Sequence, residues 1–432
     1  MVRRIVVGVV LAVAALGAGA ETVEAKAAPP SGVPGLPISL PEHGLIREMD
    51  AASAEDFSKY GFQEVHRAAW TNDMTLLERL LEGGADPNAI SNVNSRQSVL
   101  HVAARYADPD MVRRLLDAGA DANARNWNGE TPLGTAMFGS DATRALENAG
   151  LLIEAGADAD ARFEDGSSPL LILCYAIGVR NRDVAALLME HGASPYAKMS
   201  DEFGNMALHY AAVNGLVEIM TYFLEKGVDV DVRSSRGFTP LLLAAQAGQL
   251  ATVKLLVEHG ADLRAQPVDE YGLCPLHAAA FNNAAEVARY LVEQGTPVDA
   301  RSGKGNTALH LAAENGAIDA VKALIASGAD LSAKTSDEWR ELPLHRAAYF
   351  SQDKVVAHFL DLGIDVNAKA ATGSVPLTLS AEKGDLDLVK LLLERGADVT
   401  VKGAQGLTAK EWAARRNQQA TVDYLESWES RQ

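Results

Sequence analysis

The residues of this 432-residue chain that could do chemistry are histidines, cysteines and closely spaced acids. Imidazoles bind zinc or transfer protons, thiols act as nucleophiles, and neighbouring carboxylates bind calcium. Six of the ten histidines recur in one pattern, each preceded by Val or Leu and followed, after one residue, by an alanine pair. They are His66, His101, His209, His277, His310 and His345. A residue that returns in a fixed pattern belongs to a repeated unit, so we expect a structural role for these imidazoles.

Metal chemistry fits this pattern poorly. Histidines of adjacent units would lie about 8–10 Å apart at the usual distance between packed helices, whereas zinc–nitrogen bonds are about 2 Å long. The acids Asp158 with Asp160 and Asp229 with Asp231 could bind calcium weakly, but they lack a twelve-residue, oxygen-rich loop. We expect no metal and no cofactor, and we interpret these acids as exposed loop residues.

The two cysteines, Cys174 and Cys274, lie three units apart along the chain. That separation is about 25–30 Å by the same packing distance, and a disulfide needs Cα atoms within about 7 Å. We therefore expect no disulfide and two buried, unreactive thiols.

The sequence also has no G-x-S-x-G elbow, glycine-rich phosphate loop or H-E-x-x-H motif. We expect a protein that is not an enzyme; a catalytic or metal site within the irregular third and fourth units stays open as an alternative.

A Gly-Ala-Asp-like triplet recurs ten times at spacings of 33 to 37 residues. Its glycines are Gly84, Gly119, Gly156, Gly192, Gly227, Gly260, Gly295, Gly328, Gly363 and Gly396. The histidine pattern keeps phase with this triplet. Internal periods of this length are typical of solenoids and other repeat architectures.

Each unit encodes two helices. In one of them, Thr239 can cap a helix whose first residue is Pro240, where a missing N–H costs nothing. The second helix shows apolar residues at i, i+3 and i+4, namely Val253, Leu256 and Val257. Gly260 then ends that helix in a left-handed cap. One such unit cannot bury its own apolar face, so stacked units must share a continuous core.

In these motifs the chain resembles the ankyrin-repeat family from about residue 57 to the C-terminus. The resemblance implies an all-α repeat solenoid of about eleven helix-turn-helix units with β-hairpin tips. We place the array at residues 56–432, with units ending near 89, 124, 161, 197, 232, 265, 300, 333, 368 and 401, and a C-terminal cap at 402–432. It also implies that the recurring histidine forms local hydrogen bonds that order its turn.

The N-terminus resembles an export signal. Arg3 and Arg4 precede a short apolar stretch, and Ala18-Gly19-Ala20 has the small-x-small form accepted by signal peptidase. We expect a signal peptide at 1–20, cleavage after Ala20, a Pro/Ala-rich lead-in at 21–55, and a periplasmic or secreted protein. An uncleaved anchor is the alternative; we expect no other membrane span.

We expect a protein partner, of unknown identity, and favour a monomer. The net charge of −18 argues against binding nucleic acid. In the ankyrin family, partners lie along a concave face made by hairpin tips and first-helix ends. Aromatic residues at those positions are the candidates, because aromatic side chains dominate interface hot spots. They are Trp127, Phe163, Phe203, Phe238, Tyr271 and Trp339 at tips, and Tyr106, Phe138, Tyr175, Phe281, Tyr349 and Phe350 at helix ends. Basic residues lie among them, including Arg125, Arg236 and Arg340.

Two further functions stay open beside a protein-interaction scaffold. The acidic charge favours an inhibitor or immunity-type partner of a secreted enzyme. A structural envelope spacer is the other alternative. A spacer would not need surface aromatics, so the exposure of these rings separates it from a binding protein.

Overall fold

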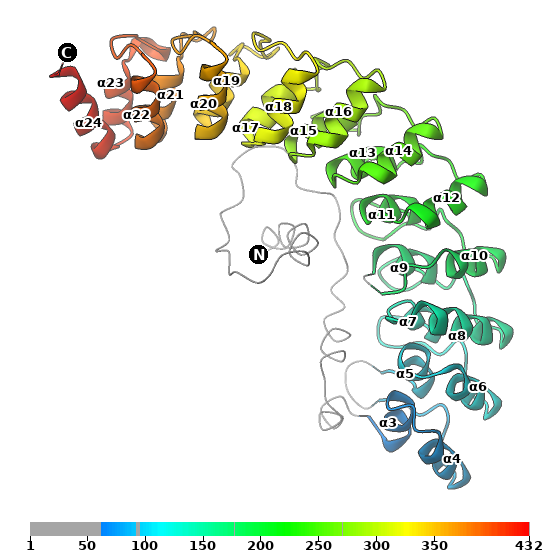
Figure 1. Cartoon of the computed structure of the whole chain (residues 1–432). Coiled ribbons are helices and arrows are strands. Elements are labelled where there is room, and N and C mark those ends of the chain that lie inside the picture. Colours follow the sequence, from blue (N-terminus) through cyan, green and yellow to red (C-terminus); the bar gives the residue numbers. More distant parts are fainter. Residues whose placement is uncertain (1–61, 92–95, 177, 270, 432) are drawn as a thin grey trace. The chain divides into compact units, whose positions relative to one another are not determined.

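The computed structural model describes residues 62–91, 96–176, 178–269 and 271–431. The predicted signal peptide, its cleavage position Ala20 and the lead-in at 21–55 lie outside these residues. Within them the chain forms 22 α-helices in eleven consecutive pairs, one short 3-10 helix and no named strand (Figure 1). The all-α repeat fold is confirmed.

The chain divides into two compact units. Within Pro37–Arg236 the described helices form five pairs: α3 (Glu64–Trp70) with α4 (Met74–Glu82), α5 (Val99–Tyr106) with α6 (Pro109–Asp117), α7 (Pro132–Ala136) with α8 (Ala142–Glu154), α9 (Pro169–Tyr175) with α10 (Arg182–Glu190), and α11 (Ala207–Val213) with α12 (Val217–Glu225).

Within Gly237–Gln432 there are six pairs. They are α13 (Pro240–Gln246) with α14 (Leu250–Glu258), α15 (Pro275–Phe281) with α16 (Ala285–Glu293), α17 (Ala308–Glu314) with α18 (Ile318–Ala326), α19 (Pro343–Tyr349) with α20 (Asp353–Asp361), α21 (Pro376–Lys383) with α22 (Leu386–Glu394), and α23 (Ala409–Arg415) with α24 (Gln419–Glu429). The 3-10 helix η3 (Ala404–Gly406) precedes α23.

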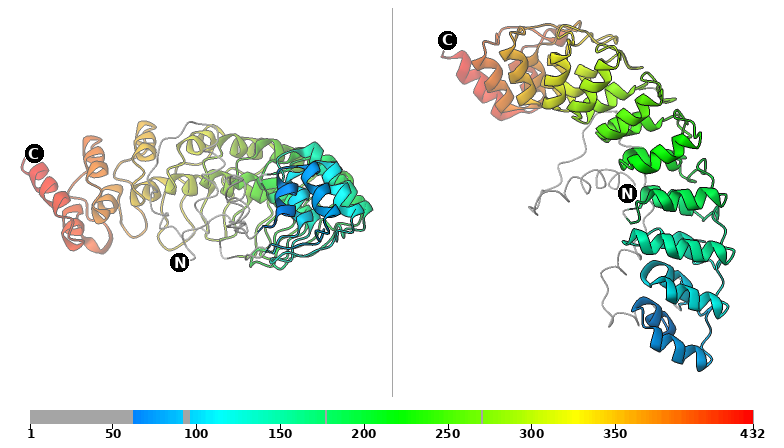
Figure 2. Two further views of the ribbon diagram at one scale, coloured as in Figure 1. Left: turned by 90° about the horizontal axis from the view of Figure 1, so that it is seen from below. Right: turned by 45° about the vertical axis from the view of Figure 1, so that its right-hand side comes forward.

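Inside each unit the first helices of successive pairs pack side by side in one layer, and the second helices form another (Figures 1 and 2). The alanine pairs lie in the first layer and are buried, as Ala103, Ala104, Ala312 and Ala313 show. Small side chains let the first helices approach closely, so each pair covers the apolar face of its neighbour. Among the described residues no helix combines the length and apolar content that a bilayer span requires.

The local signals act as their chemistry predicts. Thr239 caps α13 by accepting a hydrogen bond from the backbone N–H of Leu242 at 3.3 Å, and Pro240 is the first helical residue. Gly260 follows α14 with φ +86°, and the N–H of Ala261 donates to the carbonyl of Leu256 at 3.0 Å. This is the αL helix ending in which two N–H groups satisfy the last helical carbonyls.

The tips are tight turns. Among the described residues only isolated antiparallel bridges occur in them, at Ile90 with Ser98 and at Arg301 with Thr307. Adjacent tips hydrogen-bond to one another; the N–H of Glu164, for example, donates to the carbonyl of Asn128 at 3.0 Å. The expected β-hairpin tips are therefore short turns joined to their neighbours.

Candidate protein-binding surface

Each described tip turns on a residue with a left-handed backbone, and the tip at Gly406 has a second one, Gln405, directly before it. Eight of the described tips use glycine: Gly129, Gly166, Gly204, Gly237, Gly272, Gly305, Gly373 and Gly406. Two use arginine instead, with φ +46° at Arg96 and +45° at Arg340. The left-handed residue fixes the directions of the neighbouring side chains, so positions in a tip are counted from it as the reference position.

Where the structure describes them, the two residues before this reference position are exposed or half-buried. Trp127 lies two residues before Gly129 and is 49% exposed; Trp339 lies directly before Arg340 and is 48% exposed. Their backbones are held: the side chain of Asn126 accepts the N–H of Asn128 at 3.0 Å, and the carbonyl of Trp339 accepts the N–H of Ala371 at 2.9 Å. Each of the two compact units thus presents one exposed indole on a fixed tip.

Two other predicted tip rings are partly covered. Phe203 lies under the guanidinium of Arg236 at 4.8 Å, and Tyr271 lies under the ammonium of Lys304 at 5.5 Å, measured to the ring centroids. In each case the cation comes from the following tip. Such cation–π pairs are worth about 0.5–1 kcal/mol at exposed sites, so both rings help to join adjacent tips.

The prediction of exposed rings is wrong for Phe163 and Phe238, which are 5% and 7% exposed. Phe163 lies three residues before its tip glycine, and Phe238 lies one residue after its own. Other residues at these two positions, such as Asn126 and Glu130, are also buried. The aromatic residues of the tips were predicted to be exposed without regard to their distance from the left-handed glycine. That distance distinguishes buried from exposed positions.

The rings at first-helix ends are mostly half-buried. Tyr106 stacks on Trp70 with centroids 5.0 Å apart and an interplanar angle of 8°. Tyr349 contacts the ammonium of Lys383, 3.9 Å from its centroid. Tyr175 is the exception, being buried against Tyr210.

The remaining helix-end rings have neighbours of their own. Phe138 lies 5.4 Å from the guanidinium of Arg105, and Phe350 lies against Tyr349. The carbonyl of Phe281 accepts from the side chain of Asn315 at 2.6 Å. The side chains of Phe138, Phe281 and Phe350 are all half-buried.

The three predicted basic residues are exposed and differ in what they contact. Arg125 donates to the carbonyls of Gly129 at 2.9 Å and Arg162 at 2.8 Å, and so ties two tips together. Arg236 forms an ion pair with Glu202 in addition to covering Phe203. Arg340 lines a pocket that is described below.

The recurring histidines form local hydrogen bonds. In His310, Nδ1 accepts the N–H of Thr307 at 3.2 Å and Nε2 donates to the carbonyl of Glu341, in the next unit, at 3.0 Å. His101 repeats this arrangement with Ser98 and Glu130. Burial lowers the pKa of four of these imidazoles to about 4: His66, His101, His310 and His345. The neutral ring is the form that joins one unit to the next.

Both thiols are free and buried. Burial raises the pKa of Cys174 far above its usual range. Cys274 occupies a helix-cap position, and its Sγ lies 2.9 Å from Nδ1 of His277, as Thr307 Oγ1 lies 2.8 Å from Nδ1 of His310. His277 Nε2 donates to the carbonyl of Ala300 at 3.0 Å.

The acidic pairs also have turn contacts. The carboxylate of Asp158 accepts the N–H of Asp160 at 3.0 Å, and that of Asp229 accepts the N–H of Asp231 at 3.0 Å. Asp160 further accepts the N–H of Ser194, from the next unit, at 2.9 Å. These carboxylates order the turns after the second helices.

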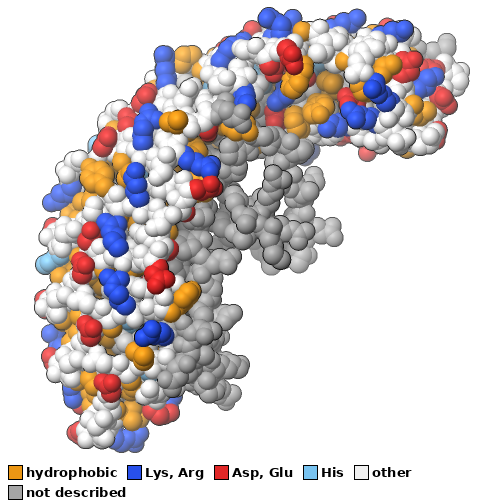
Figure 3. Space-filling model, turned by 180° about the vertical axis from the view of Figure 1, so that it is seen from behind, with side chains coloured by type: hydrophobic (Ala, Val, Ile, Leu, Met, Phe, Trp, Pro, Cys, Tyr) orange, Lys and Arg blue, Asp and Glu red, His pale blue; other side chains and the backbone are white. Residues whose placement is uncertain are grey.

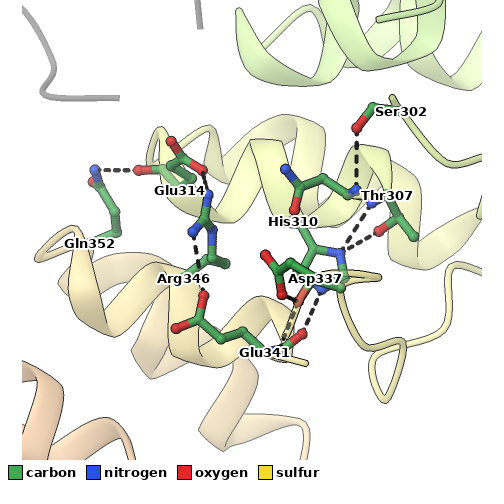
Figure 4. A network of polar contacts seen from close by, with 10 residues as sticks. Ser302, Thr307, His310, Glu314, Asp337, Glu341, Arg346 and Gln352 are labelled. Carbon is green, nitrogen blue, oxygen red and sulfur yellow. Dashed lines mark hydrogen bonds and ion pairs between the residues drawn. The ribbon is translucent and has the colours of Figure 1, made fainter. Parts of the chain in front are cut away.

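An ion-pair cluster that was not predicted from the sequence joins Glu314 at the end of α17, Arg346 in α19 and Glu341 just before α19. Figure 4 shows Arg346 between two carboxylates, with Glu314 at 2.6 Å and Glu341 at 3.3 Å. Burial raises the pKa of Glu341, and Arg346 opposes this shift. Gln352 donates to the backbone carbonyl of Glu314 at 3.0 Å. A signal was present in the sequence, because Arg346 directly follows the recurring His345 and Glu314 ends the first helix one unit earlier.

Exposed apolar side chains outside the predicted surface were missed as well: Ile90, Tyr196, Val268 and Leu362. Figure 3 shows one face of the molecule, on which basic, acidic and hydrophobic side chains are interspersed. Among the predicted binding residues, the exposed indoles of Trp127 and Trp339 on fixed tips are best suited to a protein contact.

Comparison with known proteins places this geometry in context. A family model for ankyrin repeats in three copies matches residues 65–163, 142–234, 173–267, 222–302, 263–335, 295–370 and 344–429. The chain is 31% identical over 231 residues to the human B-cell lymphoma 3 protein, covering 51% of this chain and 50% of that one.

Two ion channels are also similar. The chain is 36% identical over 110 residues to the transient receptor potential cation channel subfamily A member 1 homolog of Caenorhabditis elegans, and 27% identical over 216 residues to the human protein. These matches cover 26% and 47% of this chain, but only 9% and 19% of the channels. Among solved structures, the human ASB11 ankyrin repeat domain aligns with a TM-score of 0.46 and 24% identity, over 51% of this chain and 96% of that one.

Proposed function

The chain belongs to the ankyrin-repeat family, whose arrays are protein–protein interaction scaffolds, and we propose that this one binds its partner through its tips, with Trp127 as an anchor in one compact unit and Trp339 as an anchor in the other. The observation that carries the proposal is the exposure of these two indoles on tips with fixed backbones. Large rigid aromatic side chains lose little conformational entropy on binding, so they act as anchors.

The proposed mechanism is recognition by a preformed surface. Turns joined by hydrogen bonds and cation–π pairs need little ordering when a partner docks, so modest contacts spread over several tips add to a useful affinity. We propose no catalytic step, since the recurring histidines and the acidic pairs have local structural partners, the Cys274 thiol contacts His277, and the Cys174 thiol is buried.

The proposal includes export to a periplasm or out of the cell, supported by the N-terminal sequence of Arg3, Arg4 and the Ala18–Ala20 cleavage pattern. The exposed indoles favour a binding protein over an envelope spacer, because a spacer has no use for solvent-exposed tryptophan. An inhibitor of a secreted enzyme is a narrower form of the same proposal.

The test is affinity capture with the full chain from extracts of its native compartment. Trp127→Ala and Trp339→Ala are compared with the wild type, and Tyr196→Ala is the control because Tyr196 is equally exposed, at 47%, outside the tips. We expect the tip variants to reduce capture of a specific partner at least tenfold, as hot-spot truncations do, with Tyr196→Ala unchanged. Equal capture by all three variants would rule out the tip surface.

A further inference from the structure

A pocket of about 440 Å³ lies between two consecutive tips, the second of which carries Trp339. Its lining carries three cationic side chains, Arg301, Lys334 and Arg340, and one anionic side chain, Asp330. The pocket is therefore locally positive on a chain whose net charge is −18. A concave site with converging cations attracts and holds an oxyanion.

The walls of this pocket are fixed by hydrogen bonds. Arg301 donates to the carbonyls of Gly305 at 2.8 Å and Lys334 at 2.7 Å, and to Ser336 Oγ at 3.3 Å. Asp330 accepts from the hydroxyl of Ser332 at 2.6 Å, which lowers the pKa of its carboxyl. The acid is thus held within its own turn.

Arg340 is placed in the pocket against its backbone preference. It occupies the position where eight other tips have glycine, and it keeps the left-handed backbone, with φ +45°. Its N–H donates to the carboxylate of Asp337 at 3.1 Å, and that carboxylate also accepts from Thr335 Oγ1 at 2.6 Å. Asp337 therefore anchors the turn, and Arg340, which directly follows the exposed Trp339 in the chain, lines the pocket.

We propose that this pocket binds the carboxylates of an acidic segment of the partner protein, with Trp339 packing against the same segment. The identification of the ligand as a protein segment rests on the function proposed above. The tip that supplies Lys334 and Arg340 also carries the exposed indole of Trp339, which favours a ligand that has both apolar and acidic side chains, since free phosphate would leave Trp339 without a contact.

The experiment measures the fluorescence anisotropy of rhodamine-labelled hexaglutamate titrated with the full chain at low ionic strength, with hexaglutamine as the uncharged control. We expect the acidic peptide to bind and hexaglutamine not to bind. Lys334→Gln and Arg340→Gly should each weaken binding about tenfold, the effect of losing one good contact. Equal affinity of Arg340→Gly and the wild type would overturn the proposal.

Arg96→Gly is the matched control. Arg96 has the same left-handed backbone at a tip of the compact unit Pro37–Arg236, and it does not line this pocket. Both glycine variants relieve the same backbone strain, so both should retain or raise the melting temperature, and only Arg340→Gly should lose the peptide. Equal loss of binding in Arg96→Gly would show that the peptide follows net charge and would overturn the site.

Competition with inorganic phosphate separates the two sources of an oxyanion. We expect phosphate to displace hexaglutamate only at concentrations at least tenfold above the dissociation constant of the peptide; equal potency would assign the pocket to a free anion and overturn the protein ligand. Failure of the wild type to bind hexaglutamate would refute this inference alone, because the dependence of partner capture on Trp127 is measured separately.

Discussion

The ring of Phe163 occupies the space that a side chain at position 134 would need: a Cβ on Gly134 would lie 2.6 Å from Cζ of Phe163. In six other units this helix position carries the recurring histidine. Here an aromatic ring from the next tip reaches back across α7 in place of an imidazole reaching forward. At this position the third and fourth repeats are therefore joined by an apolar contact, whereas six other repeats carry a histidine there.

This relationship predicts coupling between the two positions. Gly134→Ala should destabilise the protein by about 1 kcal/mol, because overpacking outweighs the gain in helix propensity. Phe163→Ala should cost about 3–5 kcal/mol, the usual effect of emptying a buried aromatic site. The double variant should cost less than the sum of the two, since the alanine fits once the ring is gone. Urea unfolding followed by circular dichroism measures all three, and strict additivity would contradict the contact.

Arg96→Gly should raise the free energy of unfolding by about 0.5–1 kcal/mol. A left-handed backbone costs a residue with a side chain about 1–2 kcal/mol, and the extra freedom of glycine in the unfolded chain returns part of this gain. Thermal unfolding checks the prediction.

Gly305→Ala provides the reverse test at another tip. Gly305 has φ +77°, and a Cβ there would lie 2.3 Å from Cβ of Ser336, so the substitution should destabilise the protein by more than 1 kcal/mol. A neutral effect at Gly305 would show that the tips can adjust their backbones.

The helices and their caps were predictable from the sequence because they depend on short-range chemistry that recurs along the chain. The local contacts of the recurring histidine came from the resemblance to ankyrin repeats, and its bond to the next repeat was not predicted. The exposure of single rings was predicted correctly for Trp127 and Trp339 and wrongly for Phe163 and Phe238. Trp127 and Phe163 are both aromatic and both precede a tip glycine, yet one is exposed and the other buried because they differ by one residue in distance from it. The pocket at Arg301, Lys334 and Arg340 depends on how two tips meet, which the sequence of either tip alone does not specify.

Arg346→Met should destabilise the protein by roughly 3 kcal/mol, the range for removing one partner of a buried ion pair. Glu314 and Glu341 would then face each other without a cation, at side-chain exposures of only 4% and 12%. A double variant, Glu314→Gln with Arg346→Met, should regain part of the loss because one of the two charges is removed. Urea unfolding at pH 7 measures both.

The pH dependence of the Arg346→Met deficit is a second, independent readout. Burial already raises the pKa of Glu341, and loss of the guanidinium should raise it further. A carboxyl whose pKa is higher in the folded than in the unfolded protein favours folding below its unfolded pKa and opposes folding as pH rises through its folded pKa. The difference in stability from the wild type should therefore be largest near pH 7 and shrink towards pH 5. A deficit independent of pH would mean that lost packing, and not unpaired charge, causes it.

The buried histidines should make the array sensitive to mild acid. Burial lowers the pKa of His310 to about 4, whereas the unfolded side chain titrates near 6.5. As pH falls from 6.5 towards 4, the unfolded chain takes up a proton that the folded imidazole refuses, so stability is lost over this window, by roughly 2 kcal/mol for one such histidine at pH 5. The chain supplies its own control: Thr378 holds the equivalent position in α21, and its Oγ1 accepts the N–H of Val375 at 3.1 Å. His310→Thr should therefore keep the cap while flattening the fall in unfolding free energy between pH 7 and pH 5. An unchanged slope would show that His310 is already charged in the folded protein, which its donor contact to Glu341 and acceptor contact from Thr307 do not allow.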